Sequence, residues 1–265
     1  MKADYENRTR FLLPRRTYTV IRVDGKSFHA YTRGCQRPFD EDLMAAMDAA
    51  MVGLCENIEG ARLGFVQSDE ISVVVTDFGS TQTEAWFDGN VQKIASISAS
   101  IATAYFNRAR LAQSGEPHPD PLLGKERGPE WALFDSRVFT IPDPAEAENY
   151  LIWRQQDATR NSISMTAQAH FSHNALQGKS SNELQEMLWQ ERGINWNDMP
   201  AGFKRGRCCV RRTSTEDVEF VDKRTGETKI AKDVTRASWV VEIPPVFTQN
   251  RGWLASILPG IRETL

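Results

Sequence analysis

Apolar and polar side chains alternate with two different periods along the first half of the chain. Runs of β-branched and apolar residues predict strands at 18–25, 61–67, 71–76 and 131–141. Apolar residues that recur every three or four positions predict helices at 41–56 and 90–110. The resulting order, strand-helix-strand-strand-helix-strand, is the ferredoxin-like βαββαβ pattern. We therefore predict an α+β fold, in which an antiparallel sheet carries its helices on one face.

The second half of the chain combines helices with a hairpin. The apolar pattern predicts helices at 144–171 and 182–190, and strand patterns at 208–213 and 238–243 flank a charged hairpin. Residues 113–129 contain four Pro and three Gly and therefore predict a loop. A boundary at Pro142 is predicted to divide the chain into a first domain, 1–142, and a helical and β-hairpin region, 143–265.

Three acidic residues lie where predicted strands end. Asp24 closes the first strand, whereas Asp69 and Glu70 lie in the turn between the second and the third. Right-handed crossovers place the third strand between the first and the second, so that this strand end lies beside that turn. Carboxylates that converge at one sheet edge need a cation, and oxygen ligands suit Mg²⁺. Two such ions, about 3.5–4 Å apart, clamp the attacking and leaving oxygens of a phosphoryl transfer. The alternative is that these are ordinary turn residues.

The composition is that of a globular protein. The 265 residues are 40% hydrophobic and 25% charged, which is sufficient for a sizeable core. The four cysteines lack metal-ligand spacing and are expected to be reduced thiols. No run approaches the roughly 18 apolar residues of a membrane span, and the N-terminus has no apolar signal core. We therefore expect a cytoplasmic protein with no membrane partner.

The charge distribution points to a polyanion. The net charge is −3, but residues 204–236 carry ten Lys or Arg and six Asp or Glu. A second basic cluster comprises Arg8, Arg10, Arg15 and Arg16. A basic face on a mildly acidic body fits a nucleic acid that the active site also handles. The alternative is a solvated hairpin face. The sequence has no Walker-type loop and no recognisable Ser/His/Asp spacing.

Several motifs occur together in a characteristic order. They are Arg22-Val23-Asp24-Gly25-Lys26-Ser27-Phe28-His29, Gln67-Ser68-Asp69-Glu70, Lys93 with the Ser/Ala-rich helix after it, Phe134-Asp135-Ser136-Arg137, Trp153-Arg154-Gln155-Gln156-Asp157 and Gly193-Ile194-Asn195-Trp196-Asn197. Through them the chain resembles the tRNA-histidine guanylyltransferase superfamily, specifically its guanylyltransferase-like branch of reverse polymerases. The resemblance spans nearly the whole chain.

The resemblance implies a fold and an activity. It implies a polymerase-type palm in 1–142 and a region in 143–265 that binds tRNA and makes oligomer contacts. The implied enzyme is a template-dependent nucleotidyltransferase that adds nucleotides in the 3′-to-5′ direction to the 5′ end of tRNA. It uses two Mg²⁺ ions, ATP to activate a 5′-monophosphate, and GTP as an incoming nucleotide. Relatives resemble dimers of dimers, so we expect a homotetramer, for which Trp86, Phe87 and Trp253 suit a subunit interface.

The resemblance also implies residue roles. It implies catalytic carboxylates at Asp24, Asp69 and Glu70, with metal ligands from Asp24, Asp69 and the Gly25 carbonyl. The implied nucleotide contacts are Lys26, Ser27, Phe28, His29, Ser68 and Lys93. For Lys93, a charge near a helix N-terminus favours phosphate, and the alternative is a solvated lysine. The candidate tRNA contacts are Arg154, Arg160, Asn161, Lys204, Arg205 and Arg207.

One stretch departs from the family pattern. Eukaryotic members carry His-Ile-Asn-Asn-Leu-Tyr-Asn where this chain has Ala158-Thr159-Arg160-Asn161-Ser162-Ile163-Ser164. This difference favours repair of 5′-truncated tRNAs over addition of an extra G to tRNA-histidine, which remains an alternative. A palm-fold nucleotidyl cyclase and a non-catalytic RNA-binding protein are further alternatives. The basic hairpin and the absence of a Gly-Gly-acidic signature argue against the cyclase.

Overall fold

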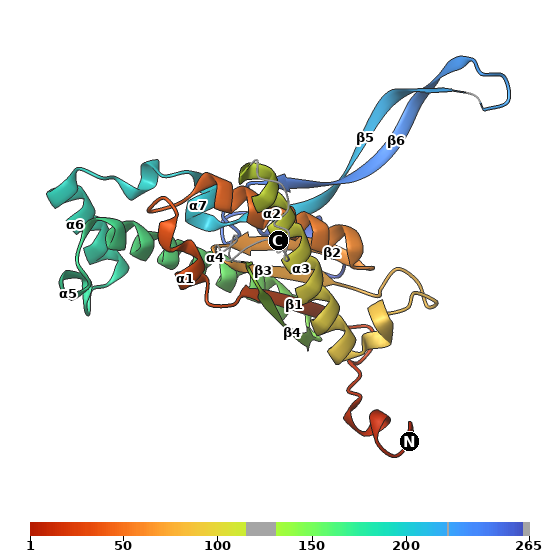
Figure 1. Cartoon of the computed structure of the whole chain (residues 1–265), viewed down its shortest axis with the longest axis horizontal. Coiled ribbons are helices and arrows are strands. Elements are labelled where there is room, and N and C mark those ends of the chain that lie inside the picture. Colours follow the sequence, from red (N-terminus) through yellow and green to blue (C-terminus); the bar gives the residue numbers. More distant parts are fainter. Residues whose placement is uncertain (115–130, 222, 262–265) are drawn as a thin grey trace, which may run out of the picture.

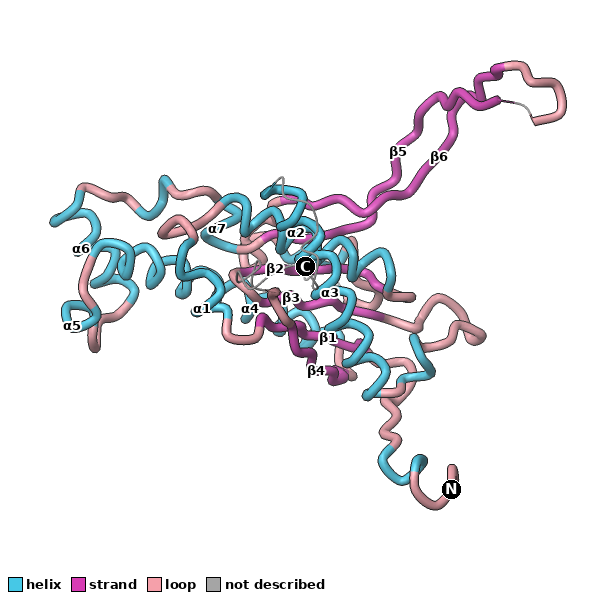
Figure 2. Tube along the Cα trace, in the orientation of Figure 1, coloured by secondary structure: helices cyan, strands magenta, loops and turns pink. Residues whose placement is uncertain are grey.

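An antiparallel six-stranded sheet forms the centre of the protein (Figures 1 and 2). The computed structural model describes residues 1–114, 131–221 and 223–261, and its strand order is β4-β1-β3-β2-β5-β6. The strands are β1 (Tyr18–Gly25), β2 (Ala61–Gln67), β3 (Glu70–Val75), β4 (Phe134–Ile141), β5 (Arg207–Val221) and β6 (Thr228–Glu242). The first four have the predicted ferredoxin-like order, with β3 between β1 and β2.

Two long helices cover one face of this sheet, as predicted. They are α2 (Glu41–Asn57) and α3 (Val91–Ser114), which extends beyond the predicted helix. Strand residues of alternating position, such as Ile21 and Val73, pack there against Met51 and Phe106. The remainder of the predicted loop at 113–129 lies outside the described residues.

The opposite face is covered by the second half of the chain. Helix α4 (Pro144–His170) begins at an N-cap, Asp143, and packs together with the C-terminal segment that contains α8 (Arg251–Ala255). Val20 and Phe65 of the sheet contact this layer, which includes Leu151 and Phe247. The sheet is therefore covered on both faces. The prediction of helices on one face holds for residues 1–142 alone, because the second half of the chain covers the other face.

The far end of α4 carries a small helical cluster. Its buried core contains Ile163, Leu188 and Trp196. The remaining helical segments are α1 (Phe28–Tyr31), α5 (His173–Leu176), α6 (Ser181–Arg192), α7 (Ala201–Arg205), η1 (Glu6–Thr9), η2 (Thr32–Gly34), η3 (Trp86–Gly89) and η4 (Trp196–Asp198). The four cysteines are free thiols, as expected. Among the described residues, no helix is long and apolar enough to cross a membrane.

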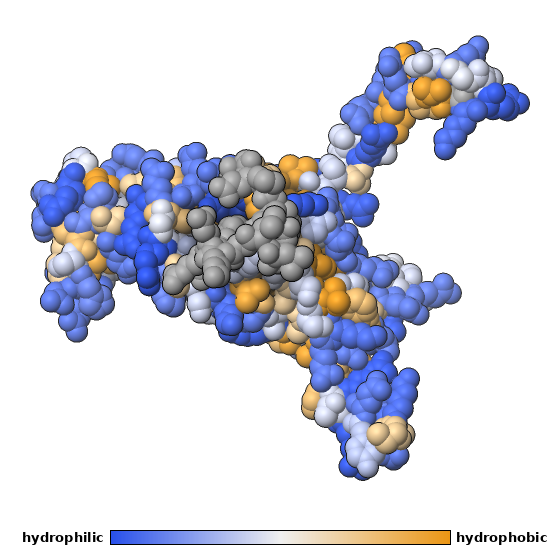
Figure 3. Space-filling model, in the orientation of Figure 1, coloured by the Kyte–Doolittle hydropathy of each residue, from blue (hydrophilic) through white to orange (hydrophobic). Residues whose placement is uncertain are grey.

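Strands β5 and β6 form an arm that projects from the sheet (Figure 1). Each has 15 residues, so both are much longer than predicted. Only the beginning of β5, from Arg207 to Val210, pairs with β2. The outer part of the arm is exposed on both faces and mixes polar with apolar side chains (Figure 3). The predicted boundary near residue 142 stays a prediction, because the second half contributes two strands to the same sheet.

Candidate active site

The end of β1 meets the hairpin turn between β2 and β3, as predicted. Asp24 lies directly opposite Glu70 in the β1–β3 ladder. The backbone N–H of Gly25 donates a hydrogen bond of 3.0 Å to the carbonyl oxygen of Asp69. On the other side of β1, Asp24 lies opposite Asp135 of β4. The fold therefore brings Asp24, Asp69 and Glu70 to one edge of the sheet and adds a fourth carboxylate.

The backbone around these carboxylates is unusual. Ser27 and Ser68 have φ values of 56° and 53°, in the left-handed region that non-glycine residues rarely adopt. Gly25 is required by packing, because a Cβ there would approach Phe28 to 2.3 Å. Strained residues of this kind persist where the surrounding structure holds them, and they cluster at functional sites.

Glu70 is occupied by two arginines. Its carboxylate lies 2.5 Å from Nη2 of Arg22 and 2.8 Å from Nε of Arg154. Burial raises the pKa of Glu70, although the charges of both arginines oppose this shift. Glu70 therefore faces α4 and its arginine rather than standing free beside the aspartates.

Asp24 and Asp69 form the remaining carboxylate pair. Burial raises the pKa of Asp69, hydrogen bonds from its own amide and from Ser68 lower it, and the negative charge of Asp24 raises it again. This electrostatic interaction is the one that a divalent cation relieves. Among the described residues, no group of three or more His, Cys, Asp and Glu side chains has the spacing of a metal site. Two carboxylates nevertheless fit Mg²⁺, which takes one or two from the protein and completes its shell with water and phosphate.

Two cavities meet at the turn that carries Asp69. One, of about 390 Å³, lies toward α2 and is lined by His29, Phe39 and Phe203, among others. The other, of about 430 Å³, lies between the end of the sheet and α4. Both are lined by the same five residues at their junction, which are Gln67, Ser68, Asp69, Met165 and Gln168. Cavities of this size accommodate nucleotide-sized ligands.

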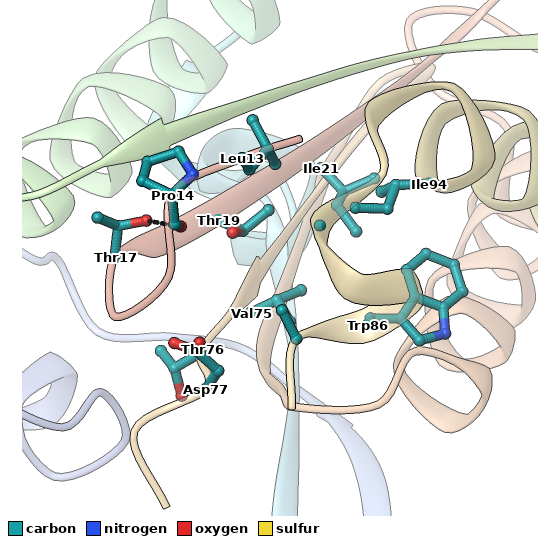
Figure 4. A pocket seen from close by; sticks show the side chains of 12 residues that line it. Leu13, Pro14, Thr17, Thr19, Ile21, Val75, Thr76, Asp77, Trp86 and Ile94 are labelled. Atoms are coloured by element: carbon teal, nitrogen blue, oxygen red, sulfur yellow. Dashed lines mark hydrogen bonds between the residues drawn. The ribbon is translucent and has the colours of Figure 1, made fainter. Parts of the chain in front are cut away.

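A third cavity lies at the opposite end of the sheet and is far smaller. Its volume is about 20 Å³, which suffices for a single water molecule. Leu13, Thr19, Trp86 and Ile94 surround it (Figure 4). No predicted site residue lines this cavity, which separates it from the carboxylates.

The predicted nucleotide contacts are only partly brought together. His29 and Ser68 line the 390 Å³ cavity, and so does Phe28, although that ring is mainly core, packed against Phe106 and Phe134. Lys26 and Ser27 follow the carboxylates directly and are exposed.

Lys93 does not join the carboxylates. Helix α3 begins beside the start of β1, where the N–H of Val91 donates to the carbonyl of Phe11. The length of β1, Tyr18–Gly25, therefore separates Lys93 from Asp24. Its ammonium lies 5.9 Å from the ring centroid of Phe87 instead.

Three of the predicted tRNA contacts are internal. Arg154, Lys204 and Arg207 are only 4%, 8% and 6% exposed. The Arg207 guanidinium donates to Asp48 at 2.6 Å, and the Lys204 ammonium donates to the carbonyl of Asn197. The three cations are buried and already paired, which argues against direct RNA contacts, and the assignments stay predictions.

The other predicted tRNA contacts remain accessible. Arg160 is exposed and pairs with Asp157 at 3.0 Å, whereas Asn161 lines the 430 Å³ cavity and donates to Gln67 at 3.5 Å. Arg205 lies 5.7 Å from the Trp196 ring. The sequence analysis gave no role to Asp135, although it lies in the motif Phe134-Asp135-Ser136-Arg137, whose place near the start of a predicted strand could have indicated an acid near Asp24.

Comparisons with known proteins agree along nearly the whole chain. A family model described as tRNAHis guanylyltransferase matches residues 1–142, and one described as Thg1 C terminal domain matches residues 145–243. A solved bacterial tRNA(His) guanylyltransferase (Thg1)-like protein in complex with ATP is 38% identical, with a TM-score of 0.80 and 97% of both chains covered. A solved complex of such a protein with GTP is 37% identical, with a TM-score of 0.74, and covers 96% of this chain and 95% of that one. The tRNA(His) guanylyltransferase of Debaryomyces hansenii is 28% identical over 93% of this chain and 94% of its own length. The chain therefore belongs to the tRNA(His) guanylyltransferase family of nucleotidyltransferases.

Proposed function

We propose that the protein adds nucleotides in the 3′-to-5′ direction to the 5′ end of tRNA and that it repairs 5′-truncated tRNAs. The observation that carries this proposal is the position of two aspartates: Asp69 lies where two cavities meet, and Asp24, on the neighbouring strand end, lines the 430 Å³ cavity. Joining a nucleotide to an RNA end needs two substrate sites that share one reaction centre. Phosphoryl transfer depends mainly on positioning and charge stabilisation, and this arrangement provides both.

The two cavities suit different substrates. The 390 Å³ cavity combines apolar side chains such as Met44 and Phe203 with the polar His29 and Arg37, which fits a nucleoside triphosphate. The 430 Å³ cavity opens between the sheet and α4, and Asn161 lines it, which fits the end of the RNA. Solved relatives hold ATP or GTP, in agreement with a nucleotide on one side of the centre.

The proposed reaction has two steps. An oxygen of the RNA 5′-monophosphate attacks the α-phosphorus of ATP, and pyrophosphate leaves. The 3′-hydroxyl oxygen of GTP then attacks the RNA 5′-phosphorus and AMP leaves, so that the triphosphate of the added nucleotide becomes the new 5′ end. An RNA that already carries a 5′-triphosphate skips the first step and releases pyrophosphate in the second.

Asp24, Asp69 and the Gly25 carbonyl are the groups that would hold two Mg²⁺ ions, which supply charge stabilisation for the transferred phosphoryl group. The hydrogen bond between Gly25 and Asp69 fixes the two aspartates relative to each other. Ser68 lies at the junction of the cavities, next to the proposed phosphate position, and its side chain hydrogen-bonds Asp69 and helps to hold that carboxylate.

Substrate choice follows from α4. The helix presents Arg160 and Asn161 near the RNA cavity, in place of the histidine-containing stretch of eukaryotic relatives. We propose that the incoming nucleotide is selected by Watson–Crick pairing with the 3′ strand of the acceptor stem, while the protein reads the RNA backbone and shape. The affinity should then fall steeply with salt concentration.

The decisive experiment supplies several tRNAs that lack their first nucleotide, each with every nucleoside triphosphate in turn. Restoration of the missing paired nucleotide, whatever the anticodon, supports repair. Addition of G only to full-length tRNA-histidine would replace repair by guanylyltransferase activity, which is the second candidate because relatives carry that name. Formation of a cyclic nucleotide from ATP or GTP alone would indicate the cyclase.

We also propose that the active assembly is a homotetramer. Apolar side chains are exposed beside the start of α3, namely Phe11, Leu12, Phe87 and Ile97, and a subunit interface would cover them. Light scattering at working concentration tests this assembly, and a monomeric mass contradicts it.

A further inference from the structure

An exposed arginine stands beside Asp24 on the edge strand. Arg137 lies on β4, which forms the lower edge of the sheet in Figure 1. Its Nη2 lies 3.9 Å from Asp24 and 3.7 Å from Asp135, and its side chain is 58% exposed. Both separations exceed a hydrogen bond, so the guanidinium is loosely held between two carboxylates.

Arg137 differs in this respect from the other arginines near the carboxylates. Arg22 and Arg154 contact Glu70 at 2.5 and 2.8 Å, and Arg160 contacts Asp157 at 3.0 Å. Their charges are balanced by close carboxylates, whereas Arg137 keeps its donors free to turn toward a new anion. A guanidinium with free donors binds a phosphate through two parallel hydrogen bonds.

An exposed aromatic side chain lies on the same side of the sheet. Trp153 of α4 is 45% exposed and stacks on the guanidinium of Arg154, 4.5 Å away. The same indole lies 5.9 Å from Tyr150, whose ring contacts Phe139 of β4 at 5.7 Å. Phe139 and Arg137 are two residues apart in β4 and therefore point to the same face. Trp153 thus lies over the β4 side of the sheet, as Arg137 does.

We propose that Arg137 and Trp153 form a contact site for the 5′ end of the acceptor RNA, in which Arg137 binds the 5′-phosphate and Trp153 stacks on the terminal base. An exposed cation and an exposed indole on the same side of a sheet are the combination that binds unpaired nucleic-acid ends without reading their sequence. Asp24 joins the two places proposed for the RNA end, because it lines the 430 Å³ cavity and lies 3.9 Å from Arg137. The nucleotide cavity lies toward α2 instead, so the two substrates approach the carboxylates from different sides. This assignment rests on the proposed function, because it takes the RNA end as the second substrate.

Binding measurements without nucleotide test the site independently of catalysis. Wild-type protein with Mg²⁺ is titrated with a 5′-truncated tRNA that carries either a 5′-phosphate or a 5′-hydroxyl. Arg137→Ala should weaken binding of the phosphorylated RNA by roughly tenfold and of the hydroxyl RNA by less than about twofold. Arg137→Lys keeps the charge but loses the two parallel donors. Its affinity for the phosphorylated RNA should therefore lie between those of wild type and Arg137→Ala.

Trp153→Ala should weaken binding of both RNAs by roughly five- to tenfold, since stacking does not depend on the phosphate. Trp153→Phe should restore most of this loss. Arg108→Ala is the control for both variants and should leave RNA binding unchanged. Arg108 is exposed, as Arg137 is, and lies over an aromatic ring, Tyr105, but it belongs to α3 on the other face of the sheet. Thermal melting checks that every variant is folded.

Three results would overturn the proposal. One is an unchanged RNA affinity in both Arg137→Ala and Trp153→Ala. Another is an Arg137→Ala variant whose KM for GTP rises while RNA binding is intact, which would show that Arg137 binds the nucleotide. The third is a loss of RNA binding that accompanies a smaller oligomer, which would show that this surface is an interface between copies of the chain.

Failure of the proposed function gives a different pattern. If wild-type protein distinguishes the 5′-phosphate from the 5′-hydroxyl but transfers no nucleotide, repair is excluded and the contact site stands. If both variants repair tRNA with unchanged KM for the RNA, the contact site is excluded and the activity stands.

Discussion

The backbone N–H of Gly25 donates a 3.0 Å hydrogen bond to the carbonyl oxygen of Asp69. These residues are far apart in the sequence and belong to different strand connections, yet this bond holds the end of β1 against the β2–β3 turn. Because Asp24 precedes Gly25, the separation of the two aspartate side chains is set by the backbone. A metal ion that needs both carboxylates meets them already in place.

Asp24→Asn and Asp69→Asn should each lower nucleotide transfer by more than about a hundredfold, because each removes charge that would hold a catalytic metal. The fold should be retained, since neither side chain forms part of the apolar core. Incorporation of labelled GTP and circular dichroism provide the two measurements. Asp4→Asn, an exposed acid at the N-terminus, is the control and should be silent. A fully active Asp69→Asn would remove Asp69 from the reaction centre.

Glu70→Ala should destabilise the protein by about 3 kcal/mol, because it leaves Arg22 and the buried Arg154 without their shared carboxylate. Urea unfolding measures the effect. The comparison variant is Glu216→Ala, which breaks the exposed 3.6 Å pair with Arg236 on the arm and should cost less than about 1 kcal/mol. Equal effects for the two variants would show that Glu70 is not an anchor for the arginines.

Gly25→Ala should destabilise the protein by roughly 1–3 kcal/mol, because the new methyl group would overlap the Phe28 ring, whose nearest atom lies at 2.3 Å. The transfer rate should also fall, and by more than the loss of stability explains, because any shift of Gly25 moves its hydrogen bond to Asp69. Gly34→Ala is the matched control, because no atom lies within 4 Å of a Cβ at that position. Thermal melting and transfer rates should therefore separate the two alanine variants clearly.

Asp40 should make stability depend on acid pH. Burial raises its pKa, but hydrogen bonds from the N–H groups of Leu43 and Gln36 and the charge of Arg110 outweigh burial and hold the pKa below the ordinary 3.8. The contribution is therefore complete above about pH 3.8 and is lost as the pH falls through the folded-state pKa. Asp40→Ala should cost about 1 kcal/mol at neutral pH through loss of the α2 N-cap.

Asp40→Asn provides the control for this prediction. Asparagine is as good an N-cap as aspartate but does not titrate, so its stability should be nearly that of wild type at neutral pH. Urea unfolding of both proteins at several pH values below 5 should show a steeper loss for wild type. Parallel curves would mean that Asp40 does not carry the pH dependence.

The sequence predicted the part of the site that depends on strand ends. The β-branched run that forms β1 stops at Asp24-Gly25, and the βαββαβ order alone places this end beside Asp69. The position of Lys93 was available from the same topology, because a helix that follows β3 must begin where β1 begins. The charge of Lys93 and its place near a helix N-terminus predicted a phosphate contact, but these two features alone do not indicate at which end of the sheet the residue lies.

Burial of the arginines was not predictable from local pattern. Arg154 and Arg207 have partners, Glu70 and Asp48, that are distant in sequence. A basic residue in a helical or strand pattern gives no sign of such a partner. The length of the arm was missed for another reason, since beyond residue 213 its strands lose apolar alternation and are held by pairing with each other.

On the ribosome, residues 1–142 emerge well before the segments that complete their sheet. Until residues 207–210 are synthesised, the outer edge of β2 has no strand beside it, and until α4 and the C-terminal segment arrive, Val20 and Phe65 face water. An unpaired strand next to apolar surface is a template for aggregation. A truncated chain that ends after β4 should therefore be poorly soluble, and nascent chains of intermediate length should depend on chaperones even though each of their strands is already present.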